Sequence, residues 1–288
     1  MPGGVYKERR CEANVEGPLL LVLTHDVDWP RRGPPREHVL ARLSRFPEEE
    51  RARFLERGEN IYYGVELLAE KEEEAGLRST FFFRPAYDDG SGVEEYGDVL
   101  RLLEEGGWEI GLHANSGESL EAIAAEKARL GRLLSLEVVS LRVHMLRVDP
   151  ALIPQLSRVG IRFDSSLCWS REAPSARSSG CMRLGGVIEL PITVMDAYLF
   201  TYWGVKPGKV AGTVLRVLEE IRRAAAFLAT LLWHDSSVRM IGGREYFELL
   251  ELLSSKDWVV PLRVRDVEEA LARYGYECAT AQPSVPSA

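Results

Sequence analysis

LLLVLTHDVDWP, residues 19–30, decides the fold of this chain, because an uninterrupted apolar run leads directly into His25, Asp26 and Asp28. Such runs are typical of strands buried on both faces, as in a parallel sheet covered by helices. The acids then stand at the carboxyl end of the strand, where α/β folds carry their chemistry. Neighbouring carboxylates repel each other unless a cation neutralises them. The stretch therefore predicts a metal site, with helix capping and solvation as the alternative.

Further apolar runs alternate with segments that have one apolar face. We expect strands near residues 79–83, 108–113, 138–144, 161–166, 187–193, 229–234 and 258–262, with helices near 60–75, 94–105, 118–134, 150–159, 210–225, 245–255 and 265–274. Repeated strand and helix units with short connections imply a parallel sheet. Seven or eight units without a linker favour one irregular (β/α) barrel over two open domains.

The barrel is expected to span residues 18–275 as a single domain. Residues 1–17 are polar and contain Pro and Gly, so they are predicted to form an N-terminal arm. A strongly charged helical insertion is predicted at about residues 31–58. Residues 276–288 are predicted to be a disordered tail.

Composition excludes several classes of function. With 45% hydrophobic and 28% charged residues, the 288-residue chain is typical of a soluble globular protein. A net charge of −8 provides no electrostatic footprint for nucleic acid. No apolar run approaches the ~20 residues of an integral membrane segment. The amino terminus lacks the apolar core of a signal peptide, which predicts a cytoplasmic location.

Nucleotide-binding and zinc-knuckle motifs are absent from the sequence. No GxGxxG follows the first strand, and no GxxxxGK[ST] occurs. The four cysteines, Cys11, Cys168, Cys181 and Cys278, are widely spaced and form no CxxC pair. We expect ordinary buried thiols, with a bridge between Cys168 and Cys181 as the alternative.

The positions of the histidines are informative, because the chain has only five. His25, His113 and His234 fall at or near the ends of predicted strands, and His144 closes another. Together with the two acids they predict a divalent-metal site on one face of the barrel. Strand alternation points His25 away from Asp26, so His25 is predicted to pack in the interior.

Seven motifs, taken in order, resemble the polysaccharide deacetylase family, the NodB-homology carbohydrate esterases. They are THDVD, STFFF, EIGLH, RVH, FDSSL, ELPITVMD and LLWH, and they cover roughly residues 18–262. The resemblance implies an α/β fold with an irregular (β/α)7-type barrel, similar to a distorted TIM barrel. It also implies a metal ion, commonly zinc, that serves to hydrolyse N-acetyl groups of amino sugars.

The resemblance assigns roles residue by residue: Asp26 as general base, Arg142 to steady it, Asp28 and His113 as metal ligands, His234 as general acid, and Asp196 to orient His234. These residue types suit amide hydrolysis. A metal polarises the carbonyl and its water, a carboxylate takes the proton of the water, and an imidazole protonates the leaving amine.

The sequence departs from the family in two places. The second motif of the family supplies two histidines four residues apart, but Gly117 stands four residues after His113. We hypothesise that His144 replaces the missing ligand, and it could instead bind substrate or pack. Lesser candidates for the ligand are Asn115, Ser116 and Ser119. A residue is also inserted between the two acids of the first motif.

The leading prediction is a carbohydrate N-deacetylase that acts on a linear amide of a small, lipid-linked or nucleotide-linked sugar. One alternative is a non-catalytic sugar-binding or scaffold barrel that has lost the metal. Another is a barrel metallohydrolase of cyclic amides or ureides. The aromatic run Tyr198, Phe200, Tyr202 and Trp203 fits a sugar-binding rim or packing under a loop equally well.

Overall fold

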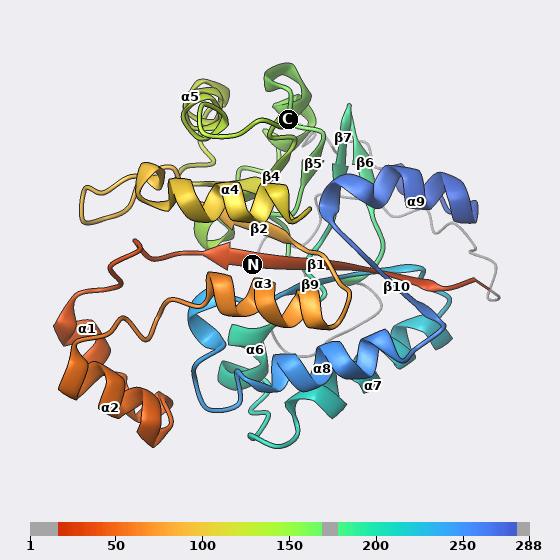
Figure 1. Ribbon diagram of the computed structural model, residues 1–288. Helices are drawn as coiled ribbons and strands as arrows, with labels where there is room; N and C mark the ends of the chain where they lie inside the picture. Colours follow the sequence, from red (N-terminus) through yellow and green to blue (C-terminus); the bar gives the residue numbers. More distant parts are fainter. Residues whose placement is uncertain (1–16, 169–177, 281–288) are drawn as a thin grey trace, which may run out of the picture.

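β1 (Leu19–Val27) runs through the middle of the molecule (Figure 1), and all nine of its residues are buried. In the computed structural model, which describes residues 17–168 and 178–280, it pairs in parallel with three strands. β9 pairs along one edge, while β10 and β2 share the other edge in succession. The apolar run of β1 is therefore explained by neighbours on every side.

The remaining strands are β2 (Thr80–Phe83), β3 (Glu109–Ala114), β4 (Ser140–Val143), β5 (Phe163–Asp164), β6 (Met182–Leu184), β7 (Val187–Glu189), β8 (Val194–Met195), β9 (Leu228–Leu232), β10 (Val259–Leu262) and β11 (Ala279–Thr280). Their order is β11-β6-β7-β5-β4-β3-β2-β1-β9-β8, with β10 beside β1. The pairings are parallel except that of β6 with β7.

One extended segment brings the two sides of the sheet together. Its first part, β7, pairs with β5, and its last part, β8, pairs with β9. Between them, the Leu190 amide donates to the Asp164 carbonyl and the Thr193 amide donates to the Thr230 carbonyl. The sheet therefore curls into an irregular barrel, as the sequence predicts.

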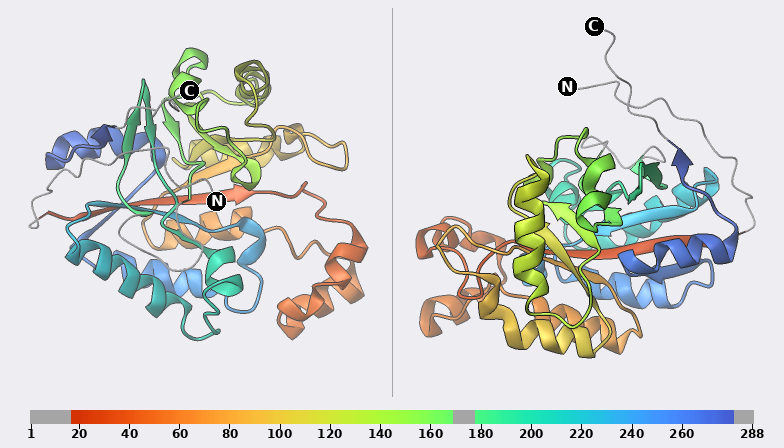
Figure 2. Two further views of the ribbon diagram at one scale, coloured as in Figure 1. Left: turned by 180° about the vertical axis from the view of Figure 1, so that it is seen from behind. Right: turned by 90° about the horizontal axis from the view of Figure 1, so that it is seen from above.

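The helices lie outside this barrel (Figures 1 and 2). They are α1 (Arg36–Leu40), α2 (Glu48–Arg57), α3 (Val65–Glu74), α4 (Gly97–Glu105), α5 (Leu120–Gly131), α6 (Asp196–Thr201), α7 (Val210–Arg223), α8 (Glu245–Ser254) and α9 (Val267–Tyr274). α7 shows why they form, because its buried residues Val210, Val214, Val217 and Ile221 recur at helical spacing. Ser119 caps the amino end of α5, and its hydroxyl accepts from the Ala122 amide.

The charged segment after β1 forms α1 and α2, which extend from the body beyond the carboxyl end of β1 (Figure 1). It has its own small apolar cluster, built from Val39, Phe46, Phe54, Ile61 and Tyr62. α2 ends at Arg57 and is followed by the capping residue Gly58, whose left-handed φ of 67° suits glycine.

The cysteines and the carboxyl terminus differ from expectation. Cys181 and Cys278 form a disulfide with a Cα–Cα distance of 4.8 Å, so the prediction of free thiols is wrong for these two residues, and the alternative bridge between Cys168 and Cys181 is wrong as well. Residues 276–280, predicted as tail, include β11, which pairs with β6. The cause is tertiary, because the partner of Cys278 lies 97 residues away. Residues 1–16 and 281–288 of the predicted arm and tail, and Cys11, lie outside the described residues.

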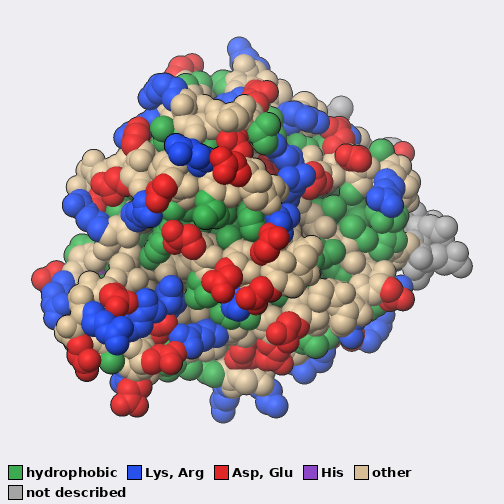
Figure 3. Space-filling view, in the orientation of Figure 1, with side chains coloured by type: hydrophobic (Ala, Val, Ile, Leu, Met, Phe, Trp, Pro, Cys, Tyr) green, Lys and Arg blue, Asp and Glu red, His purple; other side chains and the backbone are tan. Residues whose placement is uncertain are grey.

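Acidic and basic side chains are interspersed on the face shown in Figure 3. Several pair across elements, for example Arg31 with Asp98 and Arg129 with Glu94. Exposed pairs of this kind contribute about 0–1 kcal/mol each, so the stability of the fold rests on its apolar core. In the described part of the chain, no helix combines the length and apolarity needed to cross a membrane.

Candidate metal and acid–base site

The seven predicted site residues meet at the carboxyl edge of the sheet. Because β1, β3, β4 and β9 run parallel, their carboxyl ends lie side by side. Asp26, His113 and Arg142 are each the next-to-last residue of their strands. Asp28 and His144 follow β1 and β4, Asp196 begins α6, and His234 lies two residues beyond β9.

Asp28, His113 and His144 form a tight triangle of potential ligand atoms. Asp28 Oδ1 lies 3.1 Å from His113 Nε2 and 3.2 Å from His144 Nδ1, and the two ring nitrogens are 3.2 Å apart. Two donors bound at about 2.1 Å to one zinc ion at the tetrahedral angle stand about 3.4 Å apart. The triangle therefore has the size and the mixed nitrogen and oxygen chemistry of a divalent-metal site.

A hydrogen bond on the far side of the His113 ring fixes its orientation. His113 Nδ1 lies 3.0 Å from the carbonyl oxygen of Arg142 and donates to it, so Nε2 is the ring nitrogen that faces the triangle. Burial alone would raise the pKa of Asp28. Hydrogen bonds from His113 and His144 and the charge of His234 outweigh it and hold that pKa well below its ordinary value. A deprotonated carboxylate is the form that binds a metal.

Gly117 explains why a histidine is absent at the expected position. A Cβ there would lie 2.7 Å from the Arg147 carbonyl oxygen and 2.9 Å from the Val148 Cα. Gly117 forms a parallel bridge with Val148, in the loop that carries His144. Met145, next to His144, adopts a left-handed φ of 58°. The backbone of this loop occupies the space of a side chain at position 117 and brings His144 to Asp28.

The lesser ligand candidates have other partners. Asn115 Oδ1 accepts from Arg84 Nε at 2.7 Å, and Ser119 caps α5. Ser116 Oγ accepts from the Glu118 amide at 3.3 Å. Arg84 also donates to the backbone carbonyl of Asp28 at 3.1 Å, so it steadies the acidic loop as well as Asn115.

Asp26 is held by Arg142, whose side chain is fully buried. Arg142 Nη1 donates to Asp26 Oδ1 at 2.8 Å and to Thr24 Oγ1 at 3.0 Å. Nε and Nη2 donate to the carbonyl and the hydroxyl of Ser165, and the guanidinium lies over the Phe82 ring. Burial alone would raise the pKa of Asp26, but Arg142 and nearby histidines lower it. The carboxylate is therefore ionised and able to accept a proton.

His234 is oriented by the buried carboxylate of Asp196. Asp196 Oδ1 accepts from His234 Nδ1 at 2.7 Å, and Oδ2 accepts from the His234 amide at 3.0 Å. His234 Nε2 faces the site, 3.6 Å from Asp28 Oδ2. Burial lowers the pKa of His234, but the charges of Asp196, Asp28 and Asp26 outweigh it and raise the pKa to about 10. In this environment His234 carries a proton at neutral pH.

Sequence reasoning missed the groups behind these residues. Thr24 and Ser165 satisfy the guanidinium of Arg142, and Glu72 binds the His25 ring from the outer side of β1. His25 is fully buried, as alternation predicts. Glu72 gives one sequence signal, since it lies one turn after Leu68 and Ala69 on the buried stripe of α3.

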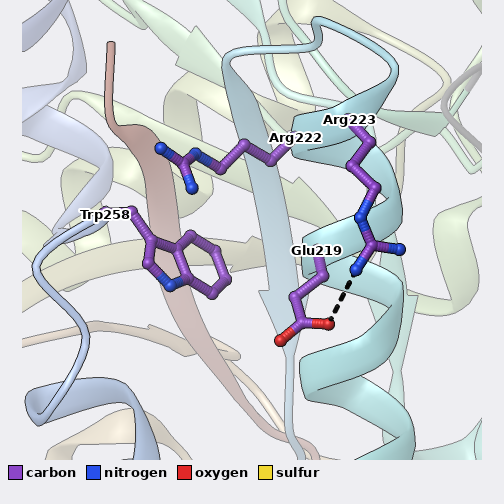
Figure 4. A pocket seen from close by; sticks show the side chains of 4 residues that line it. All are labelled: Glu219, Arg222, Arg223 and Trp258. Carbon is purple, nitrogen blue, oxygen red and sulfur yellow. Dashed lines mark hydrogen bonds and ion pairs between the residues drawn. The ribbon is translucent and has the colours of Figure 1, made fainter. Parts of the chain in front are cut away.

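The aromatic side chains after β8, predicted either to line a sugar-binding rim or to pack under a loop, differ in their exposure. Phe200 and Trp203 pack against the main core, whereas Tyr202 is exposed. A separate surface hollow of about 410 Å³ is lined by Glu219, Arg222, Arg223 and Trp258 (Figure 4). Trp258 precedes β10 and the arginines precede β9, so this hollow lies at the amino ends of the strands, opposite the candidate site.

Structural comparison identifies the fold. A Mycobacterium smegmatis protein assigned as a polysaccharide deacetylase matches with a TM-score of 0.65 and 17% identity, over 96% of this chain and 100% of its own. A Pseudomonas aeruginosa PAO1 protein with the same assignment gives 0.61 and 15%, over 88% and 91%. Puue allantoinase gives 0.61 and 11%, over 88% and 90%.

No protein-family model matches the sequence, and the comparison with curated proteins finds no match. The structural likenesses show a shared fold. The chain has the polysaccharide deacetylase fold, an irregular (β/α)7 barrel, which confirms the fold predicted from the order of the motifs.

Proposed function

We propose that this chain is a metal-dependent hydrolase that removes an N-acetyl or similar acyl group from an amino sugar or sugar conjugate. The observation that carries the proposal is the triangle of Asp28, His113 and His144. It lies between a carboxylate paired with Arg142 and an imidazole paired with Asp196. A base, an acid and a metal site are the three elements that amide hydrolysis needs.

The metal would be held by Asp28, His113 and His144, and zinc suits this set of one oxygen and two nitrogen donors. When bound, it supplies a Lewis acid for the acyl carbonyl. The buried second partner of His113, the Arg142 carbonyl, fixes the ring for this role.

The side chains perform the proton transfers. Asp26, kept ionised by Arg142, takes a proton from the water whose oxygen forms a bond to the acyl carbon. As the carbon–nitrogen bond breaks, His234 donates a proton from Nε2 to the leaving nitrogen, and Asp196 stabilises the ring in the orientation required. The products are a carboxylic acid and the amine of the sugar.

Two other functions remain as alternatives. A sugar-binding barrel without a metal would have the same fold but would not require Asp28, His113 and His144 to lie together. A hydrolase of cyclic amides or ureides has one supporting observation, the fold likeness to an allantoinase. The same three elements would serve that reaction, so substrate tests must include both classes.

The test combines metal analysis with product detection. The metal-free protein is titrated with zinc, cobalt and nickel, and acetate release from N-acetylated amino sugars is measured beside ring opening of cyclic ureides. We expect one tightly bound ion per chain and acetate release. His144→Ala should weaken metal binding at least about 10-fold, while the control Asn115→Ala binds metal like the wild type. A wild-type protein that takes up no metal would support the alternative of a sugar-binding barrel.

A further inference from the structure

The His25 ring makes two hydrogen bonds on the side of β1 that faces the helices. Nδ1 lies 2.8 Å from the carbonyl oxygen of Trp233, and Nε2 lies 2.7 Å from Glu72 Oε1. A carbonyl oxygen only accepts, so Nδ1 donates to Trp233, and the second hydrogen bond joins Nε2 to the Glu72 carboxyl group.

Glu72 is anchored more firmly than an ordinary partner. Besides His25, its carboxylate accepts from Ser79 Oγ at 2.7 Å, Trp108 Nε1 at 2.7 Å and Tyr246 OH at 2.8 Å. These donors lie beside β2, beside β3 and on α8, so three elements fix one buried carboxylate. His25 in turn is packed against the Phe81 ring at 4.7 Å. The ring has little freedom to move.

The other end of the network reaches the candidate acid. The Trp233 amide donates to the Thr24 carbonyl, and the Trp233 carbonyl accepts from His25. Both backbone polar groups of Trp233 are therefore bound to β1, at Thr24 and His25, immediately before Asp26. The backbone amide of the next residue, His234, donates to Asp196 Oδ2. The backbone that carries the acid is thus tied to the strand that carries the base.

Stability alone is a weak reason for such a network. Buried polar side chains must recover the cost of leaving water, and well-packed apolar residues often stabilise a core equally well. Holding a fixed separation between two groups is a role that apolar contacts perform poorly, because they have no preferred direction.

We propose that His25, fixed by Glu72, is a positioning residue: through the Trp233 carbonyl it sets the distance between Asp26 and His234. The inference rests on the proposed function, in which these two residues are base and acid. A displacement of about 1 Å between reacting groups can cost about 100-fold in rate, so a single directed hydrogen bond at this point is sufficient to matter.

Two variants separate the bonds of His25. In His25→Asn the amide nitrogen takes the place of Nδ1 and keeps a donor for the Trp233 carbonyl. In His25→Gln the longer side chain places its donor near Nε2, toward Glu72, and releases the carbonyl. Each variant loses one buried bond, so we expect similar falls in the free energy of unfolding.

The expected effects on turnover differ. His25→Gln should lower kcat at least about 10-fold with little change in KM, and His25→Asn should recover most of it. Tyr246→Phe removes the hydroxyl that lies 2.8 Å from Glu72 Oε1 and 3.4 Å from His25 Nε2 but leaves the bond from His25 Nδ1 to the Trp233 carbonyl, so it serves as the control for a loss of stability. Equal kcat values in the Asn and Gln variants, or kcat values that follow the melting temperature across all three, would overturn the inference.

A second measurement does not need turnover. Amide hydrogen exchange of His234 in the metal-free protein should be at least about 10-fold faster in His25→Gln than in His25→Asn. His25→Met, which has no donor, should match His25→Gln and replaces it if that variant does not fold. An inactive wild type with this exchange pattern would refute the proposed function but not the positioning role of His25. An active wild type without this pattern would refute the positioning role.

Discussion

Replacing Arg142 by Met removes the only cation that contacts Asp26 within 3 Å in the described part of the chain. The Asp26 carboxylate, 3% exposed, would be left in the barrel interior without its counter-ion. Removing one partner of a buried pair costs about 3–5 kcal/mol. The loss should be near this range at pH 7, because His113 Nε2 lies 3.7 Å from Asp26 Oδ2 and does not replace the hydrogen bond of the guanidinium.

The pH dependence follows from the sign of the shift. In the wild type the pKa of Asp26 is lowered, so the pair stabilises the fold above the ordinary carboxyl pKa and loses this contribution as the pH falls. In Arg142→Met, burial without the guanidinium raises the pKa. The deficit in unfolding free energy should then shrink between pH 7 and pH 5, by at most about 1.4 kcal/mol per pH unit.

Urea unfolding of the metal-free protein at both pH values measures these deficits, and the acidic limb of kcat/KM should move to higher pH in the variant. Arg129→Met is the matched control, because its partner Glu94 is exposed and the pair contributes about 0–1 kcal/mol. An Arg142→Met protein as stable as this control at pH 7, with an unmoved acidic limb, would refute the reasoning.

Three further predictions concern the loop, the acid and the disulfide. Gly117→Ala forces a Cβ to 2.7 Å from a carbonyl oxygen, so it should lower the free energy of unfolding by about 1–3 kcal/mol and weaken zinc binding. The control Gly131→Ala, whose Cβ would meet nothing within 4 Å, should change neither quantity. Calorimetry measures the stability and the zinc affinity of each variant. Because the pKa of His234 is raised to about 10, metal-free protein should lose stability as the pH rises from about 6.5 to 10, and Asp196→Asn should flatten that loss in denaturant titrations. Cys278→Ser opens a disulfide across 97 residues and should lower the unfolding free energy by about 2–4 kcal/mol, and an unchanged urea midpoint would contradict this.

The strands were predictable because each is a short apolar run that stands out by itself. The run at 19–23 becomes β1, and the acids that follow it reach the carboxyl edge of the sheet as expected. The inserted Val27 keeps Asp26 and Asp28 on the same side of the chain, since alternate residues share a face. One faces Arg142 and the other faces the histidines.

Contacts between distant segments were not predictable in this way. The closure of the barrel depends on one segment that pairs with β5 and then with β9, and no local pattern marks that change. The disulfide escaped because cysteine spacing carries no information about which pairs meet. The buried carboxylate of Glu72 looked like one charge among many in an acidic helix.

The sequence by itself determined the order of strands and helices and the residue types at each strand end, because periodicity and composition are local properties of the chain. Only the tertiary structure decided that His144, and not Asn115, stands beside Asp28, since that choice depends on how the loop after β4 packs against Gly117. It likewise decided that His25 faces Glu72 and Trp233. Distances across a barrel are set by packing, and packing depends on residues from many separate segments of the sequence.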